Sequence, residues 1–509
     1  ENIYVERVRA NVKRQALYCD MLGSARWVGE LAQRYPAREI TPLTPWFANI
    51  SIHDVEITGC STLVDVSALP EKPVKNFFFG NVKAHCDRIG KICDATKFSM
   101  KDVRIESCDT VMRIDNCDYA SFFGFSNVTT GSSVKIEKTG GECRYLNVQT
   151  YPLVPVNYQS IRPGEVWLDT EGKPIQAHGF QVTFREGKYY WYGEDKTHTL
   201  FGTNRMFGGV RCYSSTDFYN WKDEGRIIEP ATDPHSPLHH CQKLERPHIL
   251  YCAKTGRYVC WLKSQSNDGH FVILEAEHFM GPYHFVRNLK PNGFAVGDFD
   301  MYADPDTGKG YVWFERPHWE QICAELSDDY TNVNGRYSEH FVGKVPPFTR
   351  EAAAHFVMDG KHYIYTSGTT SYTPNPSEVA VFDDYHGEYT VLGNPHIGDE
   401  YAHSFCSQIT SVIKIPGKDL YVAMADRWLP HTNKTDIPKK DWQSFLTRYK
   451  DHRPYPKDFA TPKVADRFYT LVNPNQDVYK ATYVFLPIVV KDGIPMIEWK
   501  DEWKLENYE

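Results

Sequence analysis

Residues 357–368 read VMDGKHYIYTSG, a glycine turn followed by a strand rich in tyrosine. Four more segments have this form: FREGKYYWYGE (184–194), YCAKTGRYVCWLK (251–263), YADPDTGKGYVWFE (302–315) and IKIPGKDLYVAMAD (413–426). Strand formers on both sides of a glycine turn predict antiparallel hairpins. The turn glycines lie 52 to 69 residues apart, a length typical of four-stranded blades. The sequence therefore predicts an all-β fold with a five-bladed β-propeller over residues 160–509.

Each hairpin also carries a polar residue nine to eleven positions before its turn glycine. Because the innermost strand of each blade lines the channel of a propeller, these five residues should meet at one mouth of the channel. A ring of polar groups around water or an ion is the alternative. Three carboxylates in the same register favour a functional site. The five residues are His178, Glu245, Asp298, Glu351 and Gln408.

Glu351 stands directly before an apolar strand and next to Arg350. Close pairing with Arg350 would lower the pKa of Glu351 and make it a poor proton donor. Since neighbours on a strand point to opposite faces, we expect Arg350 to face away. Several carboxylates among aromatic residues suggest glycoside hydrolysis, in which a neutral acid protonates the leaving oxygen and a second group activates water.

Eight motifs between residues 163 and 430 carry a resemblance to a known family. They are GEVWLDTEGKPIQAHG, WYGEDK, LERPHILY, GDFDMYAD, REAAAHF, TPNP, SQIT and MADRWLP, in this order. In them the chain resembles glycoside hydrolase family 43, and most closely its exo-β-1,3-galactanase branch. The resemblance implies a five-bladed propeller, inversion at the anomeric carbon, an oligo- or polysaccharide substrate and no required cofactor. It leaves room for a structural calcium ion.

The resemblance also implies roles for single residues. Glu351 stands at the general acid, and Glu245 at a second essential carboxylate. Gln408 stands where this branch has glutamine in place of the aspartate base found elsewhere in the family. Because an amide is a poor base, Gln408 would orient water while Glu194 or Glu245 takes the proton. The substrate-binding residues implied or expected are Glu194, Asp298, His178, Arg427, Trp428 and Tyr372. Trp191 and Tyr192 are further stacking candidates, with core packing as the alternative for one of the two.

The chain departs from the family pattern at Phe180, Gly297, Ser371–Tyr372 and Ala353, the last in place of proline. These departures leave the sugar open. The first expectation is removal of terminal galactose from β-1,3-galactan or from arabinogalactan side chains of plant polysaccharide. The alternatives are an arabinofuranosidase, galactofuranosidase or xylosidase with the same machinery, and a carbohydrate-binding protein without turnover.

Residues 1–150 carry a different repeat. The pattern apolar-x-apolar-x-x-Val starts at Ile3, Ile50, Phe77, Phe98 and Phe123, and Asp or Asn precedes the valine in the last four copies. Steps of 20-odd residues predict coils of a right-handed parallel β-helix, with one weakly marked coil or a long loop between Ile3 and Ile50. The segments TPWFANISIHDV, ALPEKPVKNFFFGNV and GKICDATKFSMKDV resemble the last coils of glycoside hydrolase family 28, without its catalytic motifs. We therefore expect a non-catalytic domain.

Composition excludes several classes of function. The chain has 57 Lys and Arg against 65 Asp and Glu, a net charge of -8, so neither nucleic acid nor an anionic membrane is an expected partner. It has no apolar run long enough for membrane insertion. Its 13 cysteines form no Cys-x-x-Cys pair, and His239-His240 is expected in a solvated loop, so no metal site is predicted. A plant polysaccharide substrate implies a secreted or periplasmic enzyme. The oligomeric state stays open.

Overall fold

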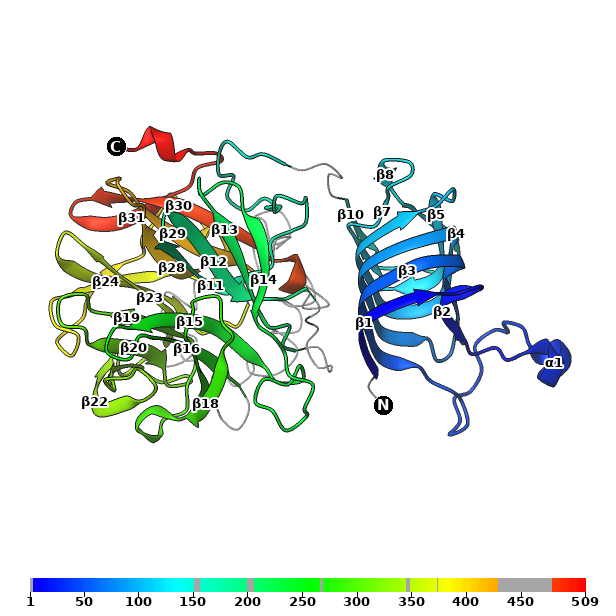
Figure 1. Cartoon of the computed structure of the whole chain (residues 1–509), viewed down its shortest axis with the longest axis horizontal. Coiled ribbons are helices and arrows are strands. Elements are labelled where there is room, and N and C mark those ends of the chain that lie inside the picture. The colour runs from blue at the N-terminus through cyan, green and yellow to red at the C-terminus, as the bar shows by residue number, and fades with distance from the viewer. Residues whose placement is uncertain are drawn as a thin grey trace. The chain divides into compact units, whose positions relative to one another are not determined.

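The computed structural model describes residues 3–150, 156–197, 199, 206–265, 269–344, 348–372, 374–428 and 478–509. The chain divides into two compact units, one formed mainly by residues up to Val156 and one by residues from Asn157 onward (Figure 1). Strands dominate both units, so the all-β expectation is confirmed. None of the helices in the described ranges is long and apolar enough to span a bilayer. These helices are α1 (Ala25–Val28), η1 (Gly29–Leu31), η2 (Pro291–Gly293), η3 (Ser404–Cys406), η4 (Val478–Lys480) and η5 (Leu505–Asn507).

The first unit is built on a parallel ladder. Its main path runs β1-β3-β4-β5-β9, and the pairs along this path are all parallel. Two of its strands are unusually long because they continue around corners. The strands are β1 (Ile3–Asn11), β2 (Gln15–Asp20), β3 (Ala48–Ser67), β4 (Val74–Glu106), β5 (Val111–Asp118), β6 (Ser121–Phe123), β7 (Ser126–Asn127), β8 (Ser132–Ser133), β9 (Lys135–Gly140) and β10 (Asn147–Gln149).

The register of this ladder matches the first three copies of the sequence repeat. Ile3 pairs with Ile50, and Ile50 pairs with Phe77. The residues between β2 and β3, which include α1, are therefore a long loop and not an extra coil. For the last copy, which starts at Phe123, the register predicted from the repeat is wrong. Met100 pairs with Phe122, so Phe98 does not lie opposite Phe123, and the valine of that copy, Val128, is 54% exposed.

Asp and Asn mark corners of the ladder. Asp54, Asn81 and Asp102 all have positive φ, a conformation that these side chains tolerate better than most. The Asn81 amide donates a hydrogen bond to Asp54 Oδ1 on the neighbouring strand at 2.5 Å. The sequence pattern thus records the positions where the backbone turns.

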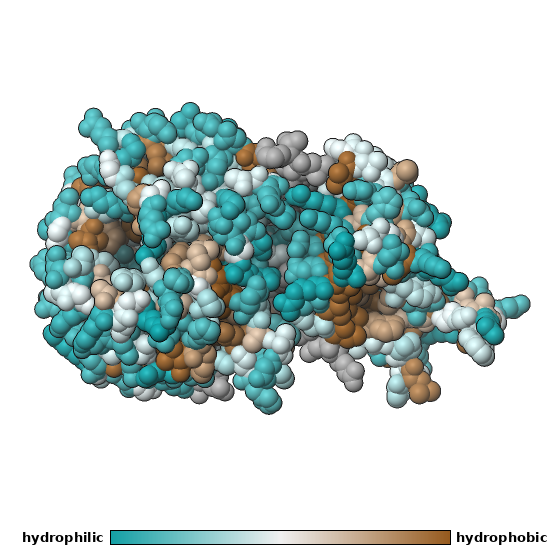
Figure 2. Space-filling view, viewed as in Figure 1, coloured by the Kyte–Doolittle hydropathy of each residue, from teal (hydrophilic) through white to brown (hydrophobic). Residues whose placement is uncertain are grey.

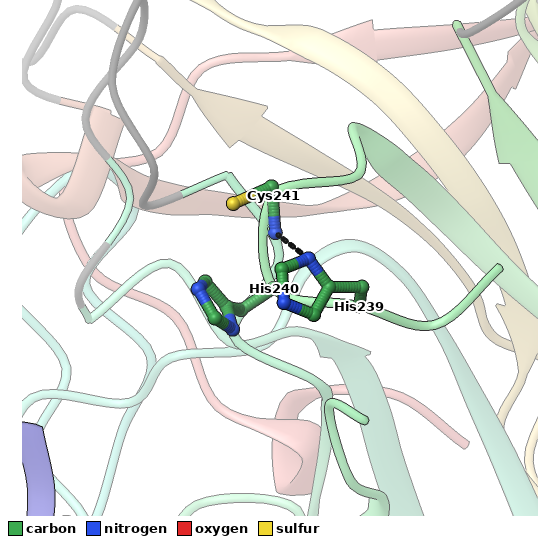
Figure 3. Close-up of side chains that lie close together, drawn as sticks. All are labelled: His239, His240 and Cys241. Carbon is green, nitrogen blue, oxygen red and sulfur yellow. Dashed lines mark hydrogen bonds between the residues drawn. The ribbon is translucent and has the colours of Figure 1, made fainter. Parts of the chain in front are cut away.

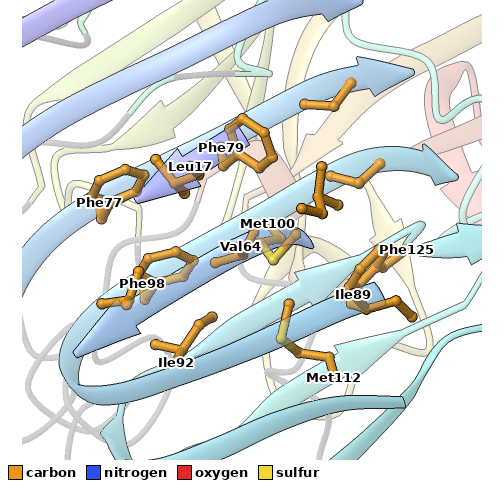
Figure 4. Packing of buried hydrophobic residues seen from close by; sticks show 14 of the residues in the cluster. Leu17, Val64, Phe77, Phe79, Ile89, Ile92, Phe98, Met100, Met112 and Phe125 are labelled. Carbon is orange, nitrogen blue, oxygen red and sulfur yellow. The ribbon is translucent and has the colours of Figure 1, made fainter. Parts of the chain in front are cut away.

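Apolar side chains from successive strands fill the interior of the first unit (Figure 4). The rings of Phe77 and Phe98 stack with centroids 4.9 Å apart. Met100, Ile92 and Met112 lie in the same buried cluster. Because each strand contributes inward residues to one continuous core, the strands stabilise one another by burying apolar surface.

The second unit consists of five sheets, each carrying one of the predicted hairpins, and the five-bladed propeller is confirmed. The first four sheets are antiparallel, and the fifth also contains one parallel pair of strands. All five turn glycines connect the two strands of the predicted hairpin and have φ between 68° and 78°. The first two sheets are β11 (His178–Arg185), β12 (Lys188–Glu194), β13 (Val210–Ser215), β14 (Lys222–Ile228), and β15 (Leu244–Cys252), β16 (Arg257–Ser264), β17 (His270–Ala276), β18 (His284–Leu289). The next two are β19 (Phe299–Ala303), β20 (Gly310–Glu315), β21 (Gln321–Leu326), β22 (Val333–His340), and β23 (Arg350–Met358), β24 (Lys361–Gly368), β25 (Glu378–Phe382), β26 (Thr390–Gly393).

The fifth sheet joins distant parts of the chain. Its inner hairpin, β28 (Gln408–Lys414) and β29 (Tyr421–Arg427), is completed by β30 (Thr482–Lys491) and β31 (Ile494–Glu498) from near the end of the chain. The short β27 (His396–Ile397) adds to the outer edge. A bridge between Ile161 and Trp503 brings the two ends of this unit together.

The propeller core lies between neighbouring sheets, where five clusters of buried apolar side chains each join two blades. Trp191 and Tyr192 are 0% and 2% exposed and belong to two of these clusters, so both are core residues and not stacking platforms. On the face drawn in Figure 2, the surface of the propeller is mostly hydrophilic, with apolar residues in small separate groups. The polar channel mouth is therefore the feature that packing does not explain.

Candidate active site

Three innermost strands carry a β-bulge at the channel mouth. The pairing register shifts directly after His178, Glu245 and Glu351. The next residue in each strand, Gly179, Arg246 or Ala352, has φ of 50° to 52°. A bulge inserts an unpaired residue and re-aims the neighbouring side chains. This shared distortion turns Glu245 and Glu351 toward the channel mouth.

A cavity of about 520 Å³, part of it open to solvent, lies at this mouth. Seven of the nine predicted site residues line it. The lining residues are Glu194, Lys196, Lys243, Glu245, Arg246, Lys263, Gln265, Asp298, Glu351, Ser371, Tyr372, Gln408 and Trp428.

His178 and Arg427 do not line the cavity, which corrects the expectation that they bind substrate. His178 is fully buried, with Nδ1 2.9 Å from Asp426 Oδ1 and its ring tilted against Trp428. Arg427 donates to the backbone oxygen of Phe405 at 2.9 Å. Its guanidinium also lies over the ring of Trp499, 5.4 Å from the ring centroid, and Trp499 is not a cavity-lining residue. His178 supports the wall of the cavity from behind.

Glu351 is a half-buried carboxyl group whose environment favours its neutral form. Burial, with the nearby Asp298 and Glu315 carboxylates, raises the pKa of Glu351 well above its usual value, against the opposing effect of Lys263 and Arg246. The expectation for Arg350 is confirmed: its guanidinium donates to Thr366 and pairs with Glu378, away from Glu351. Glu351 therefore has the protonation state that a general acid needs near neutral pH.

Gln408 holds Glu351 in place. Its Oε1 accepts hydrogen bonds from Arg246 Nη2 at 2.7 Å and Trp428 Nε1 at 3.1 Å. Because both partners can only donate, the orientation of the amide is fixed. Its Nε2 then donates to Glu351 Oε1 at 3.3 Å and to Ser367 at 3.0 Å. Oε1 of Glu351 accepts this bond, which leaves Oε2 available to carry the proton of the neutral acid.

Glu245 and Asp298 are buried carboxylates held by cations. Lys263 Nζ lies 2.7 Å from Glu245 Oε2 and 2.5 Å from Asp298 Oδ1, and Arg246 Nη2 lies 2.9 Å from Asp298 Oδ2. Burial alone would raise the pKa of Glu245, but Lys263, Lys243 and Lys196 hold that pKa far below its usual value. In the same way, Arg246 and Lys263 outweigh burial and lower the pKa of Asp298. Both groups are ionised and poorly basic.

The Glu194 side chain is more buried than those of Glu245 and Asp298, and its pKa is raised where theirs are lowered. It pairs with Lys196 and accepts the backbone N–H of Arg246 at 3.0 Å. Burial raises the pKa of Glu194 despite the nearby Lys196 ammonium. A side chain on Gly179 would put its Cβ 2.4 Å from Glu194 Oε1, so the His-Gly pair leaves the space that this carboxylate occupies.

The sequence analysis identified neither the cations of the site nor one further acid, Glu315, although the hairpin register marks two of these residues, Lys263 and Glu315. The residue seven positions after the turn glycine faces the ring residue across the first four hairpins. In the third hairpin this residue is Glu315, which is 4% exposed. Burial raises the pKa of Glu315 to about 7. The four residues at this position are Glu194, Lys263, Glu315 and Ser367.

Glu315 also accounts for one departure from the family pattern. A Cβ on Gly297 would lie 2.1 Å from Glu315 Oε2, so no side chain fits at 297 while this carboxyl group is present. Oε1 of Glu315 accepts the backbone N–H of His318 at 2.8 Å. A glycine at 297 and a glutamate at 315 thus form a matched pair beneath Asp298.

A possible metal-binding group lies outside the cavity lining. His239, His240 and Cys241 each offer a ligand atom, and these atoms lie within 4.8 Å of one another (Figure 3). The sequence analysis predicted no metal site at the two histidines, and nothing in the sequence pointed to the cysteine as a third ligand. Nitrogen and sulfur suit zinc or copper, whereas calcium takes oxygen ligands, so this group has no bearing on the calcium expectation. The structural calcium stays a prediction.

The close approach at Gly179 predicts unequal effects of two matched substitutions. Gly179→Ala and Gly187→Ala both place alanine at positive φ, which costs about 1–2 kcal/mol. At Gly187 the added Cβ meets nothing within 4 Å. We expect Gly179→Ala to lower the free energy of unfolding, measured by urea titration, by clearly more than Gly187→Ala. Equal losses would contradict the close contact with Glu194.

The raised pKa of Glu315 predicts a pH-dependent stability difference. The folded protein binds a proton at Glu315 up to about pH 7, whereas the unfolded chain releases it near 4.5. This group therefore costs stability progressively as pH rises through that window, by at most about 3 kcal/mol. Relative to wild type, Glu315→Gln should become more stable between pH 5 and pH 8 in thermal unfolding. A pH-independent difference would be evidence against a neutral Glu315.

Comparisons with known proteins agree with this geometry. Residues 180–412 match the model of Glycosyl hydrolases family 43. A solved GH43 β-1,3-galactosidase is 27% identical with a TM-score of 0.56 and covers 69% of this chain and 65% of its own. A second GH43 β-1,3-galactosidase, solved with galactodeoxynojirimycin, is 27% identical with a TM-score of 0.55. The match covers 68% of this chain and 100% of the solved chain. An exo-β-1,3-galactanase from Clostridium thermocellum is 25% identical with a TM-score of 0.52. The match covers 68% of this chain and 66% of the solved chain.

This chain spans 65% of the length of the first of these structures, which is less than two thirds. No match to the chain was found among curated proteins. The family match covers much of the second unit, and the likeness of the first unit to family 28 stays a prediction. Residues 180–412 of the propeller are therefore similar to glycosyl hydrolases family 43, the family that the sequence motifs resemble.

Proposed function

We propose that the protein is an inverting, exo-acting glycoside hydrolase that removes terminal galactose from β-1,3-galactan or from arabinogalactan side chains. The observation that carries this proposal is Glu351, a carboxyl group with a raised pKa at a cavity in a propeller that is similar to family 43. The galactose preference is supported by neighbours at 25–27% identity whose names specify β-1,3-galactosidase or galactanase activity. The reaction needs no cofactor, because every proton transfer has a side chain available.

The proposed reaction begins with Glu351. Its Oε2 proton passes to the glycosidic oxygen as the bond from that oxygen to the anomeric carbon breaks. A water molecule attacks the anomeric carbon from the opposite face and loses its proton to a carboxylate. The products are galactose with inverted configuration and a saccharide shortened by one unit. Inverting enzymes hold the two carboxyl groups roughly 6.5–9.5 Å apart to leave room for this water.

Gln408 is a positioning residue in this proposal and not the base. Both lone-pair directions of its oxygen accept hydrogen bonds, and its nitrogen donates to Glu351 and Ser367. Of the two remaining candidates, Glu245 is held ionised by lysines and takes up a proton poorly. Glu194 has a raised pKa and is the better proton acceptor. We assign Glu194 as the base and Glu245 with Asp298 as substrate-binding carboxylates.

Trp428 and Tyr372 would bind the sugar ring. They line the cavity with their rings 5.3 Å apart at 61°, and Trp428 is fixed by its hydrogen bond to Gln408. Aromatic faces pack against the apolar faces of pyranose rings. Phe180 does not bear on the choice of sugar: it is 0% exposed and packs in the core. Tyr372 is the departure that keeps arabinofuranose, galactofuranose or xylose as the second candidate.

The first unit is proposed to be a fragment of a right-handed parallel β-helix without catalytic residues. The parallel ladder with its repeating register supports this proposal. We expect it to hold polysaccharide beside the propeller or to serve as a scaffold. Because the substrate is a plant polysaccharide, we propose that the protein acts outside the cytoplasm, either secreted or in a periplasm.

The acid role predicts the effect of Glu351→Gln. Glutamine keeps the shape of the side chain but has no proton acidic enough to donate, so we expect kcat on β-1,3-galactobiose to fall by about a thousandfold or more. Product release followed by NMR measures both the rate and the anomer first formed. Ser371→Ala, which also removes a polar group from the cavity lining, is the matched control and should lose far less. Unchanged turnover in Glu351→Gln, or an anomer of retained configuration, would contradict the mechanism.

The base assignment predicts different behaviour for two glutamates. Replacing the base by alanine removes its carboxyl group and leaves room for a small anion, so azide should restore turnover in Glu194→Ala and give a glycosyl azide of inverted configuration. Glu245→Ala should lose activity through weaker substrate binding and gain nothing from azide. The measurement is product analysis with and without azide. If azide restored turnover only in Glu245→Ala, Glu245 would be the base and Glu194 a substrate-binding residue.

A further inference from the structure

A buried polar pair lies behind the cavity lining in the third blade. Glu315, the last residue of β20, faces Gln321, the first residue of β21, directly across the antiparallel ladder. The two residues are 4% and 0% exposed, and neither lines the cavity. In the first two blades the residue in the place of Gln321 is apolar, Val210 or Phe271. Packing between strands therefore does not require an amide at this position.

Gln321 connects the third blade to the fourth. Its Nε2 donates a hydrogen bond to the backbone oxygen of Arg350 at 2.9 Å. Because a carbonyl oxygen can only accept, this bond fixes the orientation of the Gln321 amide. Within the described ranges of the chain, Gln321 Oε1 is buried and accepts no hydrogen bond from an N–H or hydroxyl group. A buried acceptor without a donor is costly, so we expect a donor next to it.

Glu315 supplies such a donor when it is neutral. A neutral carboxyl group carries one O–H donor, whereas an ionised one only accepts. Oε1 of Glu315 accepts the backbone N–H of His318 at 2.8 Å, which leaves Oε2 available to carry the proton. Cβ atoms directly opposite one another in an antiparallel ladder are about 5 Å apart, so the Gln321 amide is within reach of this carboxyl group.

The groups that face Glu315 favour its neutral form. Burial and the Asp298 carboxylate raise the pKa of Glu315 to about 7, against the backbone N–H of His318 and the Lys263 ammonium. Glu315 and Glu351 also repel one another when both are ionised. The His318 ring has Nδ1 3.6 Å from Glu315 Oε1, and burial lowers the pKa of His318, so the ring adds no positive charge near neutral pH.

Through Arg350 the pair reaches the general acid. The carbonyl group that Gln321 binds belongs to the peptide bond between Arg350 and Glu351, and the register shift of the bulge follows directly. Ala352, inside the bulge, has φ of 50°, a conformation that costs energy for a residue with a Cβ. Gln408 binds the Glu351 carboxyl group at Oε1. The acid is thus held at its side chain by one glutamine and at its backbone by another.

We propose that Glu315 and Gln321 are positioning residues for the general acid: the neutral Glu315 carboxyl group donates a hydrogen bond to Gln321 Oε1, and Gln321 holds the peptide bond that leads into Glu351. This inference rests on the proposed function, because the pair acts through Glu351. Glu315 keeps its proton during the reaction and does not touch the sugar. The pair aims Glu351 at the leaving oxygen, so it contributes to the transition state and not to substrate binding.

The first experiment separates kcat from KM on β-1,3-galactobiose at pH 6. Glu315→Met has a similar volume but no donor, so it should lower kcat by about tenfold or more with little change in KM, because a small misplacement of a catalytic group slows the chemical step. Glu315→Gln offers Gln321 an N–H donor and should recover most of this kcat. Gln321→Met should match Glu315→Met, and the double variant should lose no more than either single one, since each breaks the same chain of contacts.

Glu325→Met is the matched control for a general weakening of the blade. Glu325 is 6% exposed, lies at the other end of β21, pairs with Lys309 and accepts a hydrogen bond from Asn334. This variant should lose folding stability but keep kcat. A loss of kcat as large as that of Glu315→Met would overturn the inference, and so would equal losses in Glu315→Met and Glu315→Gln.

Infrared spectroscopy tests the proton without turnover. The C=O band of a neutral carboxylic acid should appear in the difference between wild type and Glu315→Gln at pH 6. In the wild type it should fade as pH rises through about 7, where Glu315 ionises. In Gln321→Met the band should move to higher frequency, because its hydrogen bond is lost. Absence of the band, or a band that Gln321→Met leaves unchanged, would overturn the inference.

The two proposals can fail separately. If the wild-type protein cleaves no galactobiose while the infrared band depends on both Glu315 and Gln321, the proposed function fails and the hydrogen-bonded pair stands. If wild type and Glu315→Met cleave galactobiose with the same kcat, the proposed function stands and the positioning role fails.

Discussion

The structure of this site depends on the cost of burying several carboxylates around one channel mouth. An ionised carboxylate can be buried only if cations or hydrogen bonds replace its water. Lys263 and Arg246 do this for Glu245 and Asp298, and Lys196 does it for Glu194. Glu351 receives a hydrogen bond from Gln408, and among the described residues no cation forms an ion pair with it, so this carboxyl group of the cavity lining keeps its proton. The same network that stabilises the fold thus selects which acid is protonated.

Much of the propeller could be predicted from its sequence because each hairpin repeats one local signal. Turn glycines and alternating strand residues fixed the register, and that register located Glu245, Asp298, Glu351 and Gln408 at the channel mouth. The bulges could not be predicted. Ala352 has positive φ without being glycine or asparagine, so no residue type marked the distortion that re-aims Glu351. His178 has the right register as well, but its contact with Asp426 turns it into a supporting residue.

The cations were missed for a different reason. Lys263 lies directly opposite Glu245 in the hairpin, so counting forward from Gly256 as well as backward would have found it. Lys243 and Arg246 precede and follow that register position, and only side-chain geometry shows that they reach the cavity. In the first unit, the sequence repeat predicted the wrong partner for Phe123. The spacing between apolar residues is not constant from the fourth copy to the fifth, so Phe123 pairs with Lys101 and not with Phe98. Repeats predict structure best where each copy has equivalent neighbours on both sides.

The fifth sheet combines strands from distant parts of the chain, and this determines when the sheet can form during protein synthesis. Gln408 and Trp428 belong to the β28–β29 hairpin, but the strand that covers this hairpin, β30, begins at Thr482. Tyr483 in β30 also packs against His178 of the first sheet, and Phe485 contacts Trp191. The first and fifth blades can therefore close on each other only after a ribosome has released β30, more than fifty residues beyond Trp428. The cavity that Gln408 and Trp428 line is thus absent from the nascent chain until β30 has been made.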